Sequence, residues 1–253
     1  MKAALRNRAP TMNWFSWAVS THPSGRSSRE PPDGNWEPEM SRRDWEHWNS
    51  KAEGFEKKQY RIAGSGCDRE TDQWLLSRLD SEDIFMDLGC GTGRISRLVS
   101  PVVSNVVSVD GSPAMVERCI SLSESFANIT VAREDCMELP FPDGVFSAVL
   151  MSNLLHIVSD PAGAVAEAVR VLKPGGRLLA VDYSMKGMNL LQKQKMIARY
   201  LALWGPPPSS TTPMDNEQIA VLFKDKGLRI KDSVILGGKT KAACVEGEKP
   251  LQA

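Results

Sequence analysis

A glycine-rich segment in the first half of the chain has the residue types of a ligand-binding loop. It reads Asp87-Leu88-Gly89-Cys90-Gly91-Thr92-Gly93 and follows a short apolar run. Glycines at a strand-to-helix turn let a ligand approach the backbone, and the N-terminus of the following helix presents free N–H groups. Asp110 ends the next apolar run, where a carboxylate can accept hydrogen bonds from two ribose hydroxyls. The two features together predict a nucleoside-binding site.

The spacing of the glycines and the charge beside them indicate which nucleoside the loop suits. A dinucleotide site usually reads GxGxxG and holds a pyrophosphate at the helix N-terminus. Here the third glycine, Gly93, comes one residue early, and Arg94 stands where that pattern has Gly. The carboxylate of Asp87 would repel a pyrophosphate and attract an ammonium group. The loop therefore favours a cationic nucleoside over NAD.

Polar residues at the ends of two later β-rich runs are the candidates for substrate chemistry. Asn153 and His156 follow the run 145–151, and Asp182 and Tyr183 follow the run 177–181. In an open parallel sheet these positions lie at the carboxyl edge, where ligands bind. His156 is a candidate general base, and the competing interpretation is that it only shapes the pocket. Tyr183 is a candidate substrate contact, and it could equally pack or cap.

The order of the apolar runs predicts the sheet that must position these residues. Short β-rich runs at 84–88, 106–109, 129–132, 145–151 and 177–181 alternate with helical patterns, which implies crossover connections and a parallel sheet. Ser112-Pro113, Asp160-Pro161 and Thr212-Pro213 read as helix starts. Runs 228–236 and 239–245, joined by Gly237-Gly238, predict a terminal antiparallel hairpin. The predicted fold class is α/β: a doubly wound, Rossmann-like, mostly parallel seven-stranded sheet with helices on both faces.

Two helical segments outside this alternation are candidates for covering the site. From 41 to 60, Trp45, Trp48 and Phe55 recur at helical spacing, which predicts one helix that either packs in the core or forms a lid, with Trp45 and Tyr60 as substrate contacts. A second helix is expected at 69–79. The segment 185–213 is rich in Met and Leu, and its pattern predicts an amphipathic helix over the sheet. We expect it and the N-terminal helix to select the substrate.

Several of these motifs, in this order, resemble one enzyme family. The segment Asp87 to Gly93 looks like the first motif of the class I S-adenosylmethionine-dependent methyltransferases, and Leu172-Lys173-Pro174-Gly175-Gly176 resembles the turn before that family's fifth strand. Asp135-Cys136 is similar to its acidic loop after strand three. The resemblance covers roughly 45–245 and is closest to the small-molecule methyltransferases. The chain departs from the family where Ser147 follows Phe146 and Gly111 follows Asp110.

The resemblance implies a cofactor and a set of binding residues. S-adenosylmethionine would bind with Asp87 and Gly89 at its methionine part, Asp110 at the ribose, and Asp135 with Cys136 at the adenine. Cys90, Gly91, Gly93, Gly111 and Asn153 complete the predicted cofactor set. The implied reaction is direct in-line methyl transfer to a small-molecule acceptor, for which a protein supplies alignment and a water-poor pocket.

Composition limits the alternatives. Lys plus Arg and Asp plus Glu are each 31, so the net charge is zero and a nucleic-acid partner is not expected. The five cysteines show no metal-ligand spacing, which predicts no metal site and reduced thiols in a cytosol-like compartment. Arsenite as acceptor would need thiolates in one pocket, and Cys119 and Cys244 are expected on distant elements. No membrane span and no particular oligomeric state are predicted.

The expected organisation is one domain, 40–246, followed by a tail at 247–253. Residues 1–39 have no acidic residue before Glu30 and are expected to be a disordered extension or to reflect a translation start placed too early. Three other functions stay open: the same fold acting on RNA or protein, a nicotinamide-dependent oxidoreductase, and a module that binds the cofactor without catalysis.

Overall fold

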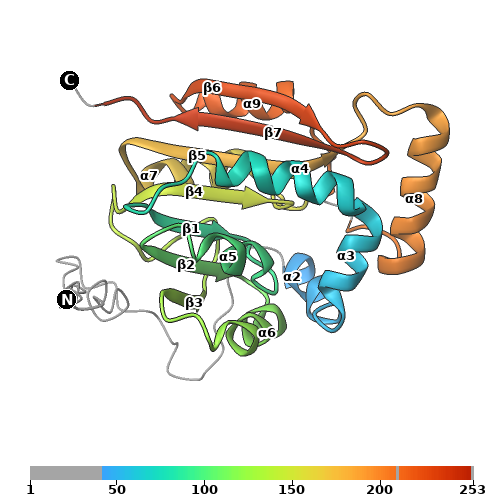
Figure 1. The fold of residues 1–253 in the computed structure, drawn as a ribbon, viewed down its shortest axis with the longest axis horizontal. Helices are drawn as coiled ribbons and strands as arrows, with labels where there is room; N and C mark the ends of the chain where they lie inside the picture. The colour runs from blue at the N-terminus through green and yellow to red at the C-terminus, as the bar shows by residue number, and fades with distance from the viewer. Residues whose placement is uncertain (1–41, 209–210, 252–253) are drawn as a thin grey trace, which may run out of the picture.

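A seven-stranded sheet forms the centre of the molecule (Figure 1). The computed structural model describes residues 42–208 and 211–251. The strands lie in the order β3-β2-β1-β4-β5-β7-β6; β1 to β5 pair in parallel, and β7 is antiparallel to both of its neighbours. This confirms the predicted doubly wound sheet with its terminal hairpin. The strands are β1 (Ile84–Leu88), β2 (Asn105–Asp110), β3 (Ile129–Arg133), β4 (Phe146–Ser152), β5 (Leu172–Ser184), β6 (Arg229–Leu236) and β7 (Lys241–Glu248).

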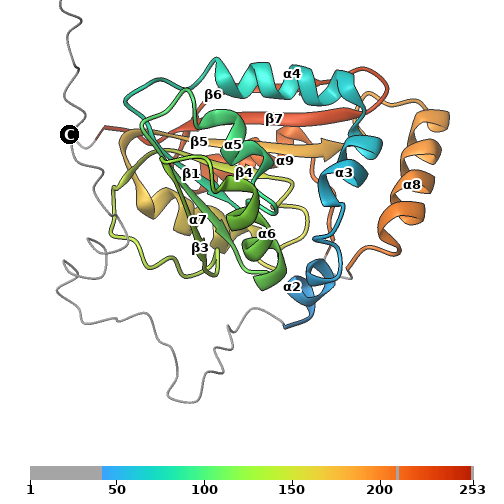
Figure 2. The ribbon, with the colours of Figure 1, turned by 60° about the horizontal axis from the view of Figure 1, so that its bottom comes forward.

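Helices cover both faces of the sheet, and three more helices lie beyond one of its ends. In Figure 1, α4 and α5 lie in front of the sheet and α7 and α9 behind it. Figure 2 shows α2, α3 and α8 together at the end where the parallel strands finish. The bounds are α2 (Arg42–Asn49), α3 (Phe55–Ala63), α4 (Ser65–Leu76), α5 (Arg94–Val99), α6 (Pro113–Ser123), α7 (Pro161–Val171), α8 (Leu190–Trp204) and α9 (Asn216–Asp225). No helix in these two ranges is long and apolar enough to cross a membrane.

The central strands are apolar throughout because both of their faces are buried. Successive side chains of a strand point to opposite faces. In β4, Val149 and Met151 therefore join the core under α7 and α9, while Ala148 and Leu150 join the core under α4 and α5. An unbroken apolar strand of this kind is expected when helices cover both faces. The strand ends are thereby fixed in register at one edge.

Two of the three predicted helix starts are confirmed, and the third is wrong. The Ser112 hydroxyl accepts a hydrogen bond from the N–H of Met115 at the start of α6, and Asp160 accepts one from Gly163 at the start of α7. The last helix does not begin at Thr212. Its N-cap is Asp215, whose carboxylate accepts from two backbone N–H groups and forms a capping box with Gln218. This capping is stronger than a threonine followed by proline.

The N-terminal segment forms two helices, so the prediction of one helix over 41–60 is wrong. The chain leaves α2 at Asn49 and enters α3 at Phe55 through Gly54, whose φ of 67° lies in the left-handed region that favours glycine. The next helix, α4, spans 65–76 rather than the expected 69–79. The predicted extension at 1–39 falls outside the described residues.

The helix in the segment 185–213 does not cover the sheet as predicted. α8 lies beyond the carboxyl ends of the strands and packs against α3 (Figure 2). Its buried residues are Met196 and Trp204, and Trp204 packs against the ring of Phe55 at 5.1 Å. At the antiparallel end of the sheet, β6 and β7 are covered by α9 and α4 instead.

Candidate functional site

A large cavity lies at the carboxyl edge of the parallel strands. Its volume is about 920 Å³, near the upper end of the size of ligand pockets. Its wall is built from the glycine loop, the ends of β2, β4 and β5, the loop after β3, and helices α2, α3, α4 and α8. The predicted site residues that line it are Trp45, Tyr60, Asp87, Gly89, Cys90, Gly91, Asp110, Gly111, Asp135, Cys136, Asn153, His156 and Tyr183.

The glycine loop takes a shape that only glycine adopts without strain. Gly89, Gly91 and Gly93 have φ values of 78°, 54° and 78°. A Cβ on Gly89 would lie 2.8 Å from the side chain of Leu154, so the loop also packs too closely for any larger residue there. Gly93 does not line the cavity. It is the N-cap of α5, and its backbone packs against the Cys119 sulfur.

Asp87 is a buried carboxylate with one oxygen left unpaired. Its Oδ2 accepts a hydrogen bond of 2.6 Å from the Ser96 hydroxyl, which in turn accepts one of 2.8 Å from Ser108. Its Oδ1 is buried and has no hydrogen-bond partner among the described residues. Burial raises the pKa of Asp87 to about 6 against the hydrogen bond from Ser96. An unpaired carboxylate oxygen in a buried wall suits a cationic group of a ligand.

Asp110 is fixed at the end of β2 by two backbone N–H groups. Its Oδ2 accepts from Gly91 at 2.8 Å and its Oδ1 accepts from Ser112 at 2.9 Å. Burial raises the pKa of this carboxyl, while the two N–H bonds oppose the rise. Each carboxylate oxygen has a second acceptor site, so Asp110 can still accept hydrogen bonds from vicinal hydroxyls. The glycine loop and the carboxylate therefore hold each other in place.

The loop after β3 carries acidic residues on another side of the cavity. Asp135 accepts a hydrogen bond of 2.9 Å from the N–H of Met137, which turns the loop back on itself. The neighbouring Glu134 also lines the cavity, and burial raises its pKa to about 7. Burial raises the pKa of the Cys136 thiol too, so this thiol stays protonated. Glu134 was not among the predicted site residues.

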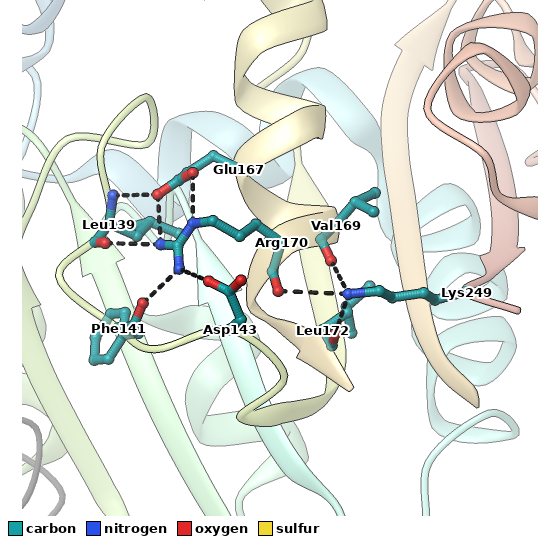
Figure 3. Close-up of polar contacts among 8 residues, drawn as sticks. All are labelled: Leu139, Phe141, Asp143, Glu167, Val169, Arg170, Leu172 and Lys249. Atoms are coloured by element: carbon teal, nitrogen blue, oxygen red, sulfur yellow. Dashed lines mark hydrogen bonds and ion pairs between the residues drawn. The ribbon is translucent and has the colours of Figure 1, made fainter. Parts of the chain in front are cut away.

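Arg170, in the last turn of α7, holds the later part of this loop (Figure 3). Its guanidinium donates to the backbone oxygens of Leu139 at 2.9 Å and Phe141 at 2.7 Å, and pairs with Asp143 and Glu167. Glu167 in turn accepts from the N–H of Leu139 at 2.8 Å. Arg170 is therefore a positioning residue: it touches no cavity atom but anchors the segment that follows Asp135 and Cys136.

Lys249 caps the C-terminal end of α7, close to Arg170 (Figure 3). Its ammonium donates to the backbone oxygens of Val169 at 2.8 Å, Arg170 at 3.5 Å and Leu172 at 2.6 Å. The last carbonyls of an α-helix have no partner within the helix and attract cations. The residue after β7 thus completes the end of α7.

His156 and Asp182 form a hydrogen-bonded pair in the cavity wall. Nδ1 of His156 lies 2.7 Å from Oδ1 of Asp182, and the Asp182 side chain is fully buried. Its Oδ2 has no hydrogen-bond partner among the described residues. Asn153 has a positive φ of 52°, and its side-chain oxygen accepts from the N–H of Tyr183. This residue therefore links the ends of β4 and β5, which carry the pair.

Aromatic rings from three helices form the apolar wall of the cavity. Trp48, Phe55 and Trp204 contact one another with ring centroids 5.1 to 6.3 Å apart. Trp45 and Tyr60 line the same cavity, and Tyr60 is also half-exposed at the surface. Sequence reasoning named Trp45 and Tyr60 as contacts but missed Trp204, because its approach to Phe55 depends on where α8 lies.

Two polar contacts tie α3 to the glycine loop and α2 to the residue that begins the turn after Asp110. Glu56 of α3 accepts a hydrogen bond of 2.9 Å from Thr92 in the glycine loop and pairs with Arg97 at 2.5 Å. Asn49 of α2 accepts one of 2.6 Å from the Ser112 hydroxyl after Asp110. Neither contact was predicted, because the partners are far apart in the sequence.

One cysteine does not lie where it was expected. Cys119 is not on a distant element: its thiol contacts Cys90 and packs against Gly93. All five cysteines are free thiols. Within residues 42–208 and 211–251, no group of three or more Cys, His, Asp or Glu side chains could hold a metal ion.

The part of the chain that carries the glycine loop and the central strands is similar to known proteins. Residues 86–180 match the family described as "Methyltransferase domain". A demethylmenaquinone methyltransferase of Tropheryma whipplei is 37% identical over 116 residues, which are 46% of this chain and 48% of that protein. A ubiquinone/menaquinone biosynthesis C-methyltransferase of Pseudomonas aeruginosa is 36% identical over 124 residues, 47% and 48% of the two chains. The chain thus spans about half the length of these curated relatives.

Solved structures share the fold over a larger part of the chain. A structure described as a SAM-dependent methyltransferase from Aquifex aeolicus has a TM-score of 0.61 at 20% identity, covering 79% of this chain and 97% of that one. The YcgJ protein of Bacillus subtilis has a TM-score of 0.59 at 21% identity, covering 73% and 100%. Together the comparisons confirm the family resemblance that the sequence motifs predicted: residues 86–180 match a methyltransferase domain, and the fold is shared with a structure described as a SAM-dependent methyltransferase.

Proposed function

We propose that this chain, whose central part is a class I S-adenosylmethionine-dependent methyltransferase domain, transfers a methyl group to a small apolar or aromatic acceptor that gives up a proton. One observation carries the proposal: a single cavity joins the glycine loop and Asp110 to the His156–Asp182 pair and the aromatic wall. One end of it suits the cofactor and the other suits an acceptor.

The cofactor end fits S-adenosylmethionine in its charges. The unpaired oxygen of Asp87 suits the ammonium of the methionine part, and the left-handed Gly89 lets the ligand approach the backbone. Asp110 has acceptor positions for the ribose hydroxyls. Asp135 and Cys136 are proposed to contact the adenine, with Cys90, Gly91, Gly111 and Asn153 beside them. Gly93 is proposed to act only through the shape of the loop.

The reaction needs little covalent chemistry from the protein. When bound, S-adenosylmethionine supplies a methyl group activated by its sulfonium charge. The chain's residues align the acceptor, exclude water and receive the acceptor's proton. Asp182 can hold Nδ1 of His156 in its protonated form, which leaves Nε2 as the ring nitrogen that can accept a proton. We assign His156 the role of general base and Asp182 that of positioning residue.

The walls of the acceptor end favour an apolar or aromatic molecule. Trp45, Trp48, Phe55 and Trp204 present ring surface to the cavity, and Tyr60 and Tyr183 add hydroxyl groups. The names of the relatives refer to quinone compounds, whose reduced headgroup is an aromatic ring with two hydroxyl groups. We therefore propose a phenol or hydroquinone as the acceptor class, in a cytosolic compartment that suits the free thiols.

A two-step experiment tests the proposal. Calorimetric titration with S-adenosylmethionine, S-adenosylhomocysteine and NAD comes first, with Asp110→Ala as the matched variant. We expect the first two ligands to bind, NAD not to bind, and the variant to lose affinity by about tenfold or more. A panel of phenols and hydroquinones is then screened for formation of S-adenosylhomocysteine. Binding without turnover on any acceptor would favour a non-catalytic module, and binding of NAD alone would favour an oxidoreductase.

A further inference from the structure

The outer side of α8 carries a row of exposed apolar side chains. Leu190, Ile197 and Leu201 follow one another at helical spacing on one face, and Leu191 lies beside them at the start of the helix. The exposed fractions are 72% for Leu190, 58% for Leu191, 43% for Ile197 and 48% for Leu201. We call these four residues the α8 stripe. Among the described residues they are half of the exposed large hydrophobic side chains, so the stripe is a concentrated patch.

The charged side chains of α8 are all positive. Leu190–Trp204 contains Lys193, Lys195 and Arg199 and no acidic residue. Within residues 42–208 and 211–251, no carboxylate lies within ion-pair distance of Lys193 or Lys195. The exposed Arg61 adds a further positive charge, since α3 packs on α8 and Arg199 donates to the Arg61 backbone oxygen at 3.5 Å. An apolar row with a basic border is complementary to an anionic lipid surface.

We propose that the α8 stripe docks the protein on the surface of an anionic membrane, with the side chains of Leu190, Leu191, Ile197 and Leu201 inserted among the lipids. α8 then lies in the plane of the interface, and Lys193 and Lys195 contact lipid phosphates. This docking does not depend on methyl transfer, so it can be tested by binding alone. Its connection with the cavity is direct, because Tyr200 and Trp204 of the same helix line the cavity wall.

The position of Tyr60 supports a functional use of the docked state. Its side chain lines the cavity and is 54% exposed beside α8. A membrane bound to α8 therefore lies next to the cavity wall. An apolar acceptor dissolved in the lipid would have a short path to the cavity.

The test is co-sedimentation of the full chain with phosphatidylglycerol/phosphatidylcholine vesicles and with phosphatidylcholine vesicles alone. We expect binding to the anionic vesicles, weakened as salt is raised. The variant Leu190→Gln/Leu201→Gln should bind about tenfold or more weakly. Gln preserves helix propensity, so α8 should still form. The control is Ile120→Gln/Val221→Gln, two apolar positions on α6 and α9 that are about half-exposed, and it should bind like the unmodified protein.

Removal of charge is the second arm of the experiment. The double variant Lys193→Gln/Lys195→Gln should bind the anionic vesicles about fivefold more weakly for each charge removed. Its binding to neutral vesicles should equal that of the unmodified protein. Equal binding of the unmodified protein and the stripe variant would overturn the proposal. So would a dimer, seen by light scattering without lipid, that the stripe variant disrupts, because the stripe would then be an interface between two copies. Melting temperatures of all variants check that each is folded.

Discussion

Nδ1 of His156 lies 2.7 Å from Oδ1 of Asp182; His156 lies in the loop after β4, and Asp182 lies near the end of the neighbouring parallel strand β5. The Asp182 side chain is fully buried, and its other oxygen has no partner among the described residues. The carboxylate is therefore available to hold the imidazole in one orientation. This relationship leads to the first prediction, which separates proton transfer from binding.

His156→Asn should lower kcat by about 10²- to 10⁴-fold, the range for loss of a general base, and leave the affinity for S-adenosylmethionine unchanged. Asp182→Asn should also lower kcat, because the asparagine NH₂ can donate to Nδ1 of His156 and so favour the tautomer that carries its proton on Nε2. The rates are measured with a phenol that is neutral at the assay pH and with one that is already ionised. The loss should be much smaller for the ionised phenol. An equal loss for both would mean that His156 does not receive a proton.

Cofactor binding should depend on pH through Asp87, whose pKa burial raises to about 6. A bound ammonium favours the ionised carboxylate, so the affinity should be full above pH 6. It should fall as the pH drops through about 6, approaching tenfold per pH unit below that value. Titrations of S-adenosylhomocysteine from pH 5 to 8 measure this. Adenosine has no amino-acid part, so its affinity should not follow the same curve. A flat profile for both ligands would remove Asp87 from the ammonium site.

Asp87→Asn should weaken cofactor binding and yet stabilise the ligand-free protein at neutral pH. A carboxyl whose pKa is raised from 3.8 to about 6 by folding binds more protons in the native state across that window. The free energy of unfolding therefore falls as the pH rises from 4 to 6. At pH 7 the total loss relative to low pH is about 3 kcal/mol. Asparagine should recover a large part of this. Urea unfolding at pH 7 and pH 4 tests the sign, because the gain should shrink at pH 4.

Glu56→Gln should weaken cofactor binding by about fivefold, because α3 loses part of its charge-assisted contact with Thr92 and Arg97. The Glu56 side chain is partly exposed, so solvent limits the effect. Amide hydrogen exchange of α3 should rise in the same variant. The control is Glu53→Gln, because Glu53 lies just before α3 and its side chain is exposed. If both variants behave alike, the Glu56 contact does not hold α3 on the loop.

Arg170→Met should destabilise the protein by about 2–4 kcal/mol, since the guanidinium donates to two backbone oxygens that would lose their partner. It should also reduce cofactor affinity although Arg170 does not line the cavity, because the loop after β3 loses its anchor. Thermal unfolding and calorimetry measure the two effects. Arg229→Met, on an exposed arginine of β6, serves as the comparison. Unchanged affinity at full folding would show that the loop keeps its shape without Arg170.

Local patterns were sufficient to predict the sheet and the positions of Asp87 and Asp110 at its carboxyl edge. Apolar runs marked the strands, and Asp87 and Asp110 stand directly at strand ends, so their positions at one edge followed from parallel pairing. Ser112 and Asp160 predicted where α6 and α7 begin, because an N-cap and a first-turn proline act within a few residues. These signals are local in sequence and in space.

The remaining features depend on contacts between distant segments. The His156–Asp182 pair needs the register of β4 on β5, in which Ser152 lies beside Val181. The contact of Cys119 with Cys90 needs the position of α6. The pattern of α8 showed an apolar face, but periodicity alone does not say whether that face meets the sheet, a helix or the solvent. The helix predicted over 41–60 is interrupted at residues 50–54, and Gly54 enters α3 with a left-handed φ of 67° that helical periodicity does not reveal.

The strand order has a consequence for how the protein is made on the ribosome. β6 is synthesised before β7, yet β7 lies between β6 and β5, and β6 pairs with no other strand of the sheet. Until residues 241–248 emerge, β6 has no partner and one edge of β5 is open. Unpaired edges of this kind invite pairing with other chains. The nascent protein should therefore be most vulnerable to aggregation in the interval between synthesis of β5 and release of β7, and a chaperone that covers an open strand edge would act in that interval.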